Sequence, residues 1–304
     1  MKTILNKRTT DKSTSSKVYF TSQITPDALM RIYESLGKKA EGRVAVKLST
    51  GEPGGHHFLS ATLIAPLVKE VKGTIVECNT AYGGKRDDTH SHRMVAENHG
   101  FTSIAEVDIM DADGEMRLPV KNGTVLGENI VGTHLSNYDF LVDLVHFKGH
   151  MMGGFGGAIK NLSIGVASSA GKLKIHNGGV EGKPIDMDAA QDPFLECMAE
   201  ATGTVIDFFG DRVIHINIMN NLSVDCDCDS NPHAPEIPDI GILASLDPVA
   251  LDQACVDLVY SCEKGDNKPL IERMESRHAV HILEHADEIG MGTRNYELIS
   301  IDED

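Results

Sequence analysis

Two histidines and two lysines bracket a run of glycines near the middle of this chain, between residues 146 and 160. Four ionisable side chains around a glycine-rich turn are hard to explain as part of an apolar core. A neutral imidazole can bind a metal or transfer a proton, and a desolvated lysine can act as a base or hold an anion. The candidate catalytic residues are His146, Lys148, His150 and Lys160. The candidate substrate-binding residues of the same segment are Gly153, Gly154, Gly156, Gly157 and Asn161.

A Cys-x-Cys motif among three aspartates follows a predicted strand later in the chain. Cys226 and Cys228, with His233 nearby, offer thiolate and imidazole ligands that suit zinc or an iron–sulfur centre. Two cysteines cannot complete a four-thiolate site, so a cluster would need ligands from elsewhere. Alternatively, both are inert thiols, because neighbouring carboxylates raise thiol pKa values unless a cation is present. The candidate metal ligands are Cys226, Cys228 and His233.

Two further loops carry glycines and charged groups that could contact an anion. The loop over residues 49–57 leads into a predicted helix, whose first N–H groups favour an anion. It is neither a Walker loop nor a dinucleotide fingerprint, because the required spacings are absent. The loop over residues 79–89 contains lysine and arginine, which pair with carboxylates and phosphates. A tight turn and a solvated charged loop are the alternative interpretations. The candidate substrate-binding residues here are Gly54, Gly55, His56, Tyr82 and Lys85.

Short apolar runs alternate with amphipathic stretches along the chain, which is typical of an α/β fold. The predicted strands span residues 17–21, 43–48, 74–78, 139–146, 213–219, 240–244 and 296–301. The predicted helices span residues 25–36, 58–71, 90–99, 193–209, 249–259 and 277–289. Short β segments are expected over residues 104–135, with turns at Asp113-Gly114 and Asn122-Gly123. Because sites in open parallel sheets lie at the carboxyl ends of the strands, the polar loops should meet at one edge.

The length of 304 residues suggests about two domains or one large one. We expect a flexible tail over residues 1–16, which is rich in Ser and Thr. An N-terminal α/β half over residues 17–137 and a C-terminal α/β half over residues 138–304 should follow. Both halves should have mainly parallel strands, with the site in the crevice between them.

The composition limits the partners that the protein can have. With 28 Lys and Arg against 45 Asp and Glu, the formal charge of −17 disfavours nucleic acid and anionic membrane surfaces. The sequence has no apolar run long enough for a transmembrane helix. Six cysteines in a chain of this length favour a reducing, cytoplasmic environment over a disulfide scaffold. The expected partner is a small anionic molecule, and a homo-oligomer stays an open alternative.

Several ordered motifs together resemble a known family. They are KVYFT, VAVKLSTGEPG, ECNTAYGGKR, GFGGAIKNLSIGVASSAGKLK, CDCDSNPHAPEIPDIGILASLDPVALDQA and EIGMGTRNYELI. Over residues 17–301 the chain resembles the uncharacterised iron–sulfur-centre proteins of the domain-of-unknown-function family three-six-two. Many members carry a ferredoxin-type module with four-cysteine spacing, inserted after the AGKL segment. Residues 176–193 of this chain contain no cysteine, so the resemblance implies the core domain without that module.

The resemblance implies a metal- or iron–sulfur-associated protein. We expect an enzyme that acts on a small anionic metabolite, with a metal ion or cluster held by Cys226 and Cys228. The loop pattern is also similar to that of nickel-dependent hydroxy-acid racemases, by analogy only. A non-catalytic module that binds a metal or an anionic metabolite is the alternative, and a scaffold with an acidic surface is a third.

Overall fold

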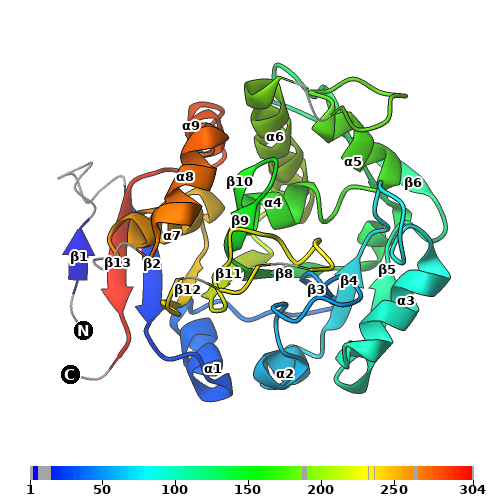
Figure 1. The fold of residues 1–304 in the computed structure, drawn as a ribbon. Coiled ribbons are helices and arrows are strands. Elements are labelled where there is room, and N and C mark those ends of the chain that lie inside the picture. Colours follow the sequence, from blue (N-terminus) through cyan, green and yellow to red (C-terminus); the bar gives the residue numbers. More distant parts are fainter. Residues whose placement is uncertain are drawn as a thin grey trace.

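The computed structural model describes residues 3–5, 15–186, 190–231, 233–235, 237–262 and 266–302. A large mixed sheet runs through the centre of the fold (Figure 1). In spatial order its strands are β1 (Thr3–Leu5), β13 (Tyr296–Ser300), β2 (Ser16–Thr21), β12 (Gly241–Ser245), β11 (Val213–Met219), β8 (Phe140–His146), β3 (Val44–Lys47), β4 (Thr74–Glu77) and β5 (Val107–Ile109). The strands from β11 to β5 are all parallel, so their carboxyl ends share one edge.

Two small antiparallel pairs accompany the main sheet. They are β9 (Lys148–His150) with β10 (Gly154–Gly156), and β6 (Glu115–Pro119) with β7 (Glu128–Gly132). The first pair follows directly after β8, so it extends from the carboxyl edge of the parallel strands.

Helices cover both faces of the sheet, giving three layers (Figure 1). One face is covered by α1 (Pro26–Ser35), α2 (Ala61–Glu70) and α3 (Thr89–Asn98). The other is covered by α4 (Ala158–Ser163), α5 (Ser169–His176), α6 (Gln191–Phe209), α7 (Pro248–Tyr260), α8 (Lys268–Ser276) and α9 (His281–Glu288). Short 3₁₀ turns occupy Phe101–Ser103 and Thr133–Asn137.

The central strands are apolar because both of their faces are buried. In β3, Val44 and Val46 pack in the core under α1 and α2, whereas Ala45 packs in the core on the opposite face. This two-residue alternation is the pleat of a strand between two helical layers. Several helices begin at a side-chain cap: Asp247 accepts hydrogen bonds from the N–H groups of Val249 and Ala250 at the start of α7.

The prediction of an α/β fold with a mainly parallel sheet is confirmed. Most predicted strands and helices agree with the structure to within a few residues. The predicted helix over residues 277–289 is wrong at its start, because the chain turns at His278 and α9 begins at His281. No helix was predicted over Lys268–Ser276, where α8 lies.

The predicted division at residue 137 stays a prediction. The main sheet itself is continuous across that point, because β8 pairs with β3 on one side and β11 on the other. Most of the predicted tail, residues 1–2 and 6–14, lies outside the described residues. Within it, Thr3–Leu5 pairs with β13.

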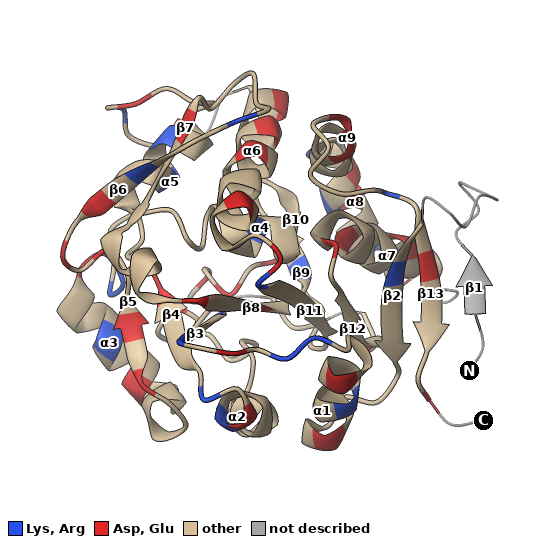
Figure 2. Ribbon diagram, turned by 180° about the vertical axis from the view of Figure 1, so that it is seen from behind, with Lys and Arg blue, Asp and Glu red and all other residues tan. Residues whose placement is uncertain are grey.

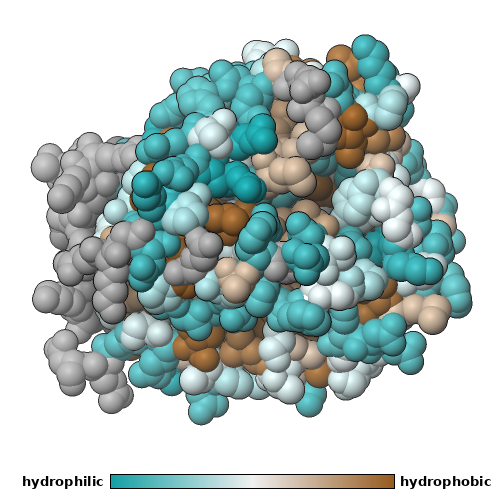
Figure 3. Space-filling model, viewed as in Figure 1, coloured by the Kyte–Doolittle hydropathy of each residue, from teal (hydrophilic) through white to brown (hydrophobic). Residues whose placement is uncertain are grey.

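Charged residues are spread over the elements, and one face of the molecule is mainly hydrophilic. Seen from behind, the ribbon carries acidic residues on helices of both layers, including α1 and α6 (Figure 2). The opposite view is mainly hydrophilic, with hydrophobic side chains in small, scattered groups (Figure 3). In the described part of the chain, no helix combines the length and the apolar character that a membrane crossing requires.

Candidate functional site

A cavity of about 110 Å³ lies at the carboxyl edge of the parallel strands. The last residues of three strands, Lys47, Glu77 and His146, lie in its wall. The β9–β10 hairpin, α4, α5 and the loop that contains Cys226 and Cys228 close it on the other sides. The position is the one expected for a ligand site in an open parallel sheet.

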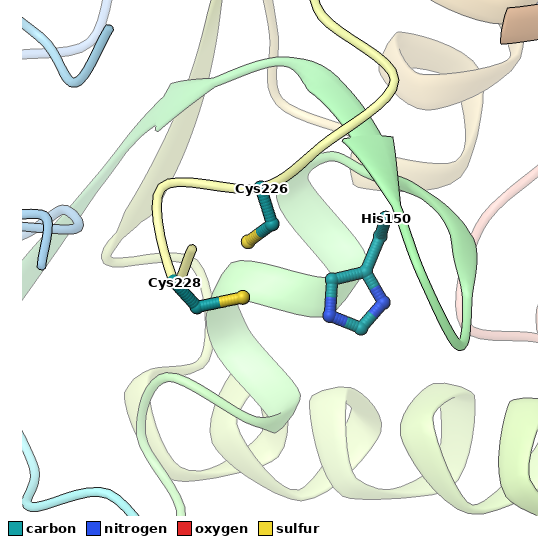
Figure 4. A group of neighbouring side chains, drawn as sticks. All are labelled: His150, Cys226 and Cys228. Atoms are coloured by element: carbon teal, nitrogen blue, oxygen red, sulfur yellow. The ribbon is translucent and has the colours of Figure 1, made fainter. Parts of the chain in front are cut away.

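Cys226, Cys228 and His150 converge in this cavity (Figure 4). Their ligand atoms all lie within 4.8 Å of one another. The two cysteines come from the loop after β11, and His150 comes from the last position of β9. Both sulfurs and the edge of the imidazole ring point into the same space.

A close approach between backbones brings the hairpin to the cysteine loop. The N–H of Gly149 donates to the carbonyl of Ser223 over 2.8 Å. A Cβ at residue 149 would collide with the backbone of Val224, so glycine is required there. This contact sets His150 beside the thiols.

The ring of His150 is oriented by its own turn. Its Nδ1 accepts hydrogen bonds from the N–H groups of Gly153 over 2.9 Å and of Met152 over 3.3 Å. Nδ1 is therefore the acceptor nitrogen, and Nε2 carries the proton of the neutral ring. Burial lowers the pKa of His150 well below its ordinary value, aided by the nearby cation Lys160. His150 thus presents an N–H donor to the thiols.

A buried ion pair holds the loop that contains the two cysteines. Asp227 lies between the two cysteines, and its carboxylate binds Lys148 Nζ over 2.7 Å and His146 Nδ1 over 2.8 Å. His146 Nε2 lies 2.6 Å from the carbonyl of Asn220, so both ring nitrogens face protein acceptors. Lys148 and His146 therefore position the loop: both ring nitrogens of His146 are engaged, and Lys148 uses two of its three N–H donors.

The two thiols share a proton asymmetrically. A hydrogen bond from Cys228 lowers the pKa of Cys226, burial opposes this, and the ammonium groups of Lys160 and Lys148 lower it further. The same hydrogen bond and burial raise the pKa of Cys228. The hydrogen bond and the nearby ammonium groups thus favour loss of the first proton of the pair at Cys226.

Two ammonium groups in the cavity have no carboxylate partner among the described residues. They belong to Lys160 on α4 and Lys172 on α5. Lys172 Nζ donates to the carbonyl of Ala167, and burial lowers its pKa. An anion that enters the cavity would compensate both charges, since a buried charge is stable only when it is paired.

The other cations of the cavity are already paired. Arg86 binds Glu52 over 2.7 Å, and it lies 3.5 Å from Glu77. Lys47 Nζ lies 3.5 Å from Glu77 and donates to the amide oxygen of Asn161. Burial nevertheless lowers the pKa of Lys47. These side chains form a polar part of the cavity wall, and their charges are already compensated by carboxylates.

Ten of the predicted site residues line the cavity. They are His146, Lys148, His150, Lys160, Asn161, Gly156, Gly157, Tyr82, Cys226 and Cys228. The amide of Asn161 is occupied by Lys47 and Asp143, which makes it a connector between strands.

The other predicted site residues lie outside the cavity wall: Gly54, Gly55, His56, Lys85, Gly153, Gly154 and His233. The loop of Gly54 and Gly55 instead packs against the backbone of Ser230 and Asp229, and so supports the cysteine loop. Lys85 is exposed, whereas the next residue, Arg86, is buried in the cavity. The side chain of His233 is 78% exposed and pairs with Asp225.

Five cavity residues with a charged or imidazole side chain were not among the predicted site residues: Lys47, Glu77, Arg86, Lys172 and His176. Lys47 and Glu77 are the only charged residues in the apolar strands β3 and β4, and both lie at the carboxyl end. A charged residue at the carboxyl end of an otherwise apolar strand could therefore have indicated a site residue. Lys172 and His176 lie four residues apart on one face of α5, a spacing that becomes informative only once that helix is known.

Fold and site together define an α/β protein whose parallel strands carry a cation-lined cavity and a close pair of cysteines. The chain belongs to the family described as domain of unknown function DUF362, whose model matches residues 44–257. No curated protein matches the sequence.

Two solved structures show a distant likeness. The lactate racemase apoprotein from Thermoanaerobacterium thermosaccharolyticum is 14% identical, with a TM-score of 0.48 over 81% of this chain and 57% of that one. A Thermotoga maritima protein solved by a structural genomics consortium is 12% identical, with a TM-score of 0.41 over 86% of this chain and 58% of that one. This chain thus covers little more than half the length of either protein.

Proposed function

We propose that the protein is an enzyme that acts on a small anionic metabolite in this cavity, with a thiophilic metal ion held by Cys226 and Cys228. The observation that carries the proposal is the meeting of two cations without carboxylate partners, Lys160 and Lys172, with a polarised pair of thiols in one cavity. An apolar or cationic ligand would leave those charges uncompensated.

The residues fit a single metal ion better than an iron–sulfur cluster. A four-thiolate cluster needs four cysteines, and two meet here. Cys78 also lines the cavity, but its Sγ donates to the carbonyl of Val166, and it is outside the group within 4.8 Å. Two thiolates suit zinc, nickel or copper and leave further coordination positions open. Such an ion would act as a Lewis acid that polarises an oxygen of the substrate.

His150 acts as a hydrogen-bond donor in this proposal rather than as a metal ligand. A ligating histidine donates from its other ring nitrogen, but Nδ1 of His150 accepts hydrogen bonds from two backbone N–H groups. Coordination through Nε2 would therefore require the ring to turn over or lose its proton. In the arrangement described, Nε2–H stabilises negative charge on the thiols or on a bound anion.

The unpaired lysines have distinct tasks. Lys160 binds the negative group of the metabolite, because its ammonium is the more accessible of the two. Lys172 is buried and its pKa is lowered, so its ammonium gives up and takes back a proton at Nζ more readily than a solvated lysine does. An incoming anion near Lys172 would favour proton uptake there.

A non-catalytic binding module is the second candidate. It is favoured by the ion pairs of Lys148, His146 and Arg86, which leave few groups free for chemistry. The two functions differ in whether a bound anion changes chemically.

The experiment tests anion binding first and chemistry second. Thermal melts of the protein loaded with Zn²⁺ or Ni²⁺ are measured with acetate, glycolate, malate and phosphate. We expect at least one anion to raise Tm in the native protein and not in Lys160→Met, whereas the control Lys85→Met, at an exposed lysine, keeps the shift. The proposal fails if no anion raises Tm, or if Lys160→Met responds like the native protein.

The same anions are then incubated in D₂O and followed by proton NMR. Exchange of a carbon-bound hydrogen or a new product, abolished in Lys172→Met, supports an enzyme. Binding without any change in the tested anions favours the binding module.

A further inference from the structure

A second group of metal-binding side chains lies away from the cavity, where α6 meets the turn between α8 and α9. Asp192 stands in the first turn of α6, and His278 and His281 flank the start of α9. One ligand atom from each residue lies within 4.8 Å of the other two. None of the three lines the cavity that holds the thiols.

The three side chains are already oriented toward one another. His278 Nδ1 lies 2.7 Å from a carboxylate oxygen of Asp192. The rings of His278 and His281 are nearly parallel, with their centroids 5.0 Å apart. His281 Nε2 lies 2.9 Å from Glu196, one turn further along α6, which stands outside the group within 4.8 Å.

The backbone turn that presents His278 has a left-handed conformation. His278 has a φ of 49°, in the left-handed region that residues with a Cβ adopt only occasionally. This conformation ends α8 and brings the imidazole beside Asp192, 86 positions earlier in the chain. The site therefore connects segments that are distant in sequence.

We propose that Asp192, His278 and His281 bind a divalent transition-metal ion, with Zn²⁺ as the expected occupant, and that the ion clamps α6 to α9. Two imidazoles with carboxylate oxygens form a donor set that suits Zn²⁺, whereas Mg²⁺ and Ca²⁺ prefer oxygen ligands alone. Glu196 and Glu284 add negative charge close to His281, at 2.9 and 3.9 Å. Figure 2 shows acidic residues on both α6 and α9.

The clamp would reinforce an existing contact between the two helices. His285, one turn after His281, lies 3.2 Å from Glu200 on α6. Glu200 in turn accepts hydrogen bonds from the backbone of Thr124 and Leu126. A metal at the exposed end of this row would fix the two helices where solvent otherwise reaches them.

The test uses the full chain without a histidine tag, and it counts bound Zn²⁺ after equilibrium dialysis. In Cys226→Ser/Cys228→Ser, where the cavity thiols are removed, we expect one Zn²⁺ per chain. His278→Ala/His281→Ala on that background should bind none. The control His56→Ala/His90→Ala removes two exposed histidines elsewhere and should keep the ion.

A second readout covers the case in which the serine variant does not fold. In the otherwise native chain, His278→Ala/His281→Ala should bind one Zn²⁺ fewer than the native protein. Zn²⁺ should also raise the Tm of this variant less than it raises the Tm of the control. The proposal is overturned if the histidine variant binds as much Zn²⁺ as the control. The cavity thiols are intact in this variant. Loss of Zn²⁺ from the site of His278 and His281 can therefore be told apart from a failure of the cavity thiols to bind metal.

Discussion

Asp227 and Lys148 form a buried ion pair 2.7 Å long, and the aspartate that makes it stands between the two cysteines of the cavity. The carboxylate thus anchors the loop of the two thiols to Lys148 on β9. Burial alone would lower the pKa of Lys148, but Asp227, Cys226 and Cys228 together outweigh it and raise the pKa. The pKa of Asp227 is lowered in turn by His146 and Lys148, against the opposing effect of burial.

Asp227→Asn is expected to destabilise the protein by about 3–5 kcal/mol, because it leaves the ammonium of Lys148 buried without its counter-charge. The free energy of unfolding in urea measures this loss. The double variant Asp227→Asn/Lys148→Met removes both charges and should lose less than Asp227→Asn alone. Equal or greater loss in the double variant would show that the ion pair does not carry the effect.

Cys226 is predicted to be the reactive cysteine of the cavity in metal-free protein. The hydrogen bond from Cys228 lowers the pKa of Cys226, so Cys228→Ala should raise that pKa and slow the alkylation of Cys226 by iodoacetamide at neutral pH. The rate falls about tenfold for each unit by which the pKa rises above the pH. Mass spectrometry at Cys226 reports the rate.

Cys78→Ala serves as the matched control for this experiment. Burial raises the pKa of Cys78 to about 12, so its removal should leave the alkylation of Cys226 unchanged. An unchanged rate in Cys228→Ala would contradict the shared-proton description of the pair.

Acid should destabilise the protein partly through His176. Burial lowers the pKa of His176 from 6.5 to about 4, and the ring stacks on Phe194. Between these pH values the unfolded chain binds more protons than the folded one, so stability falls as the pH falls from 6.5 toward 4. The contribution lost by pH 4 is about 3 kcal/mol.

His176→Gln cannot titrate, so it isolates this contribution. The free energy of unfolding of the native protein should drop by about 3 kcal/mol more than that of the variant between pH 7.5 and pH 4. Parallel curves for the two proteins would show that His176 does not carry the acid sensitivity.

The sequence allowed the sheet to be predicted because its central strands are short apolar runs, as in Phe140–His146. It also placed the polar loops at one edge, since parallel strands end together. Which residues of a loop face the cavity could not be predicted, because that depends on the local turn. Arg86 is buried and Lys85 exposed, although the two are adjacent.

The sequence also could not predict which histidine lies beside Cys226 and Cys228. His233 follows Cys228 closely in sequence, whereas His150 reaches the thiols through the packing of Gly149 against Val224. Long-range backbone contacts of this kind leave no periodic signal. Conversely, α8 was not predicted because its residues, Lys268–Ser276, are largely polar and begin with Lys-Pro.

The central claim is that Cys226 and Cys228 together hold a metal ion in the cavity. Anaerobic titration of metal-free protein with Co²⁺ tests it directly, because thiolate-bound cobalt gives a near-ultraviolet charge-transfer band. We predict that this band develops to saturation in the native chain and in Cys78→Ser, and that it is absent from Cys226→Ser and from Cys228→Ser. No band in the native chain, or an undiminished band in both of these serine variants, would contradict the claim.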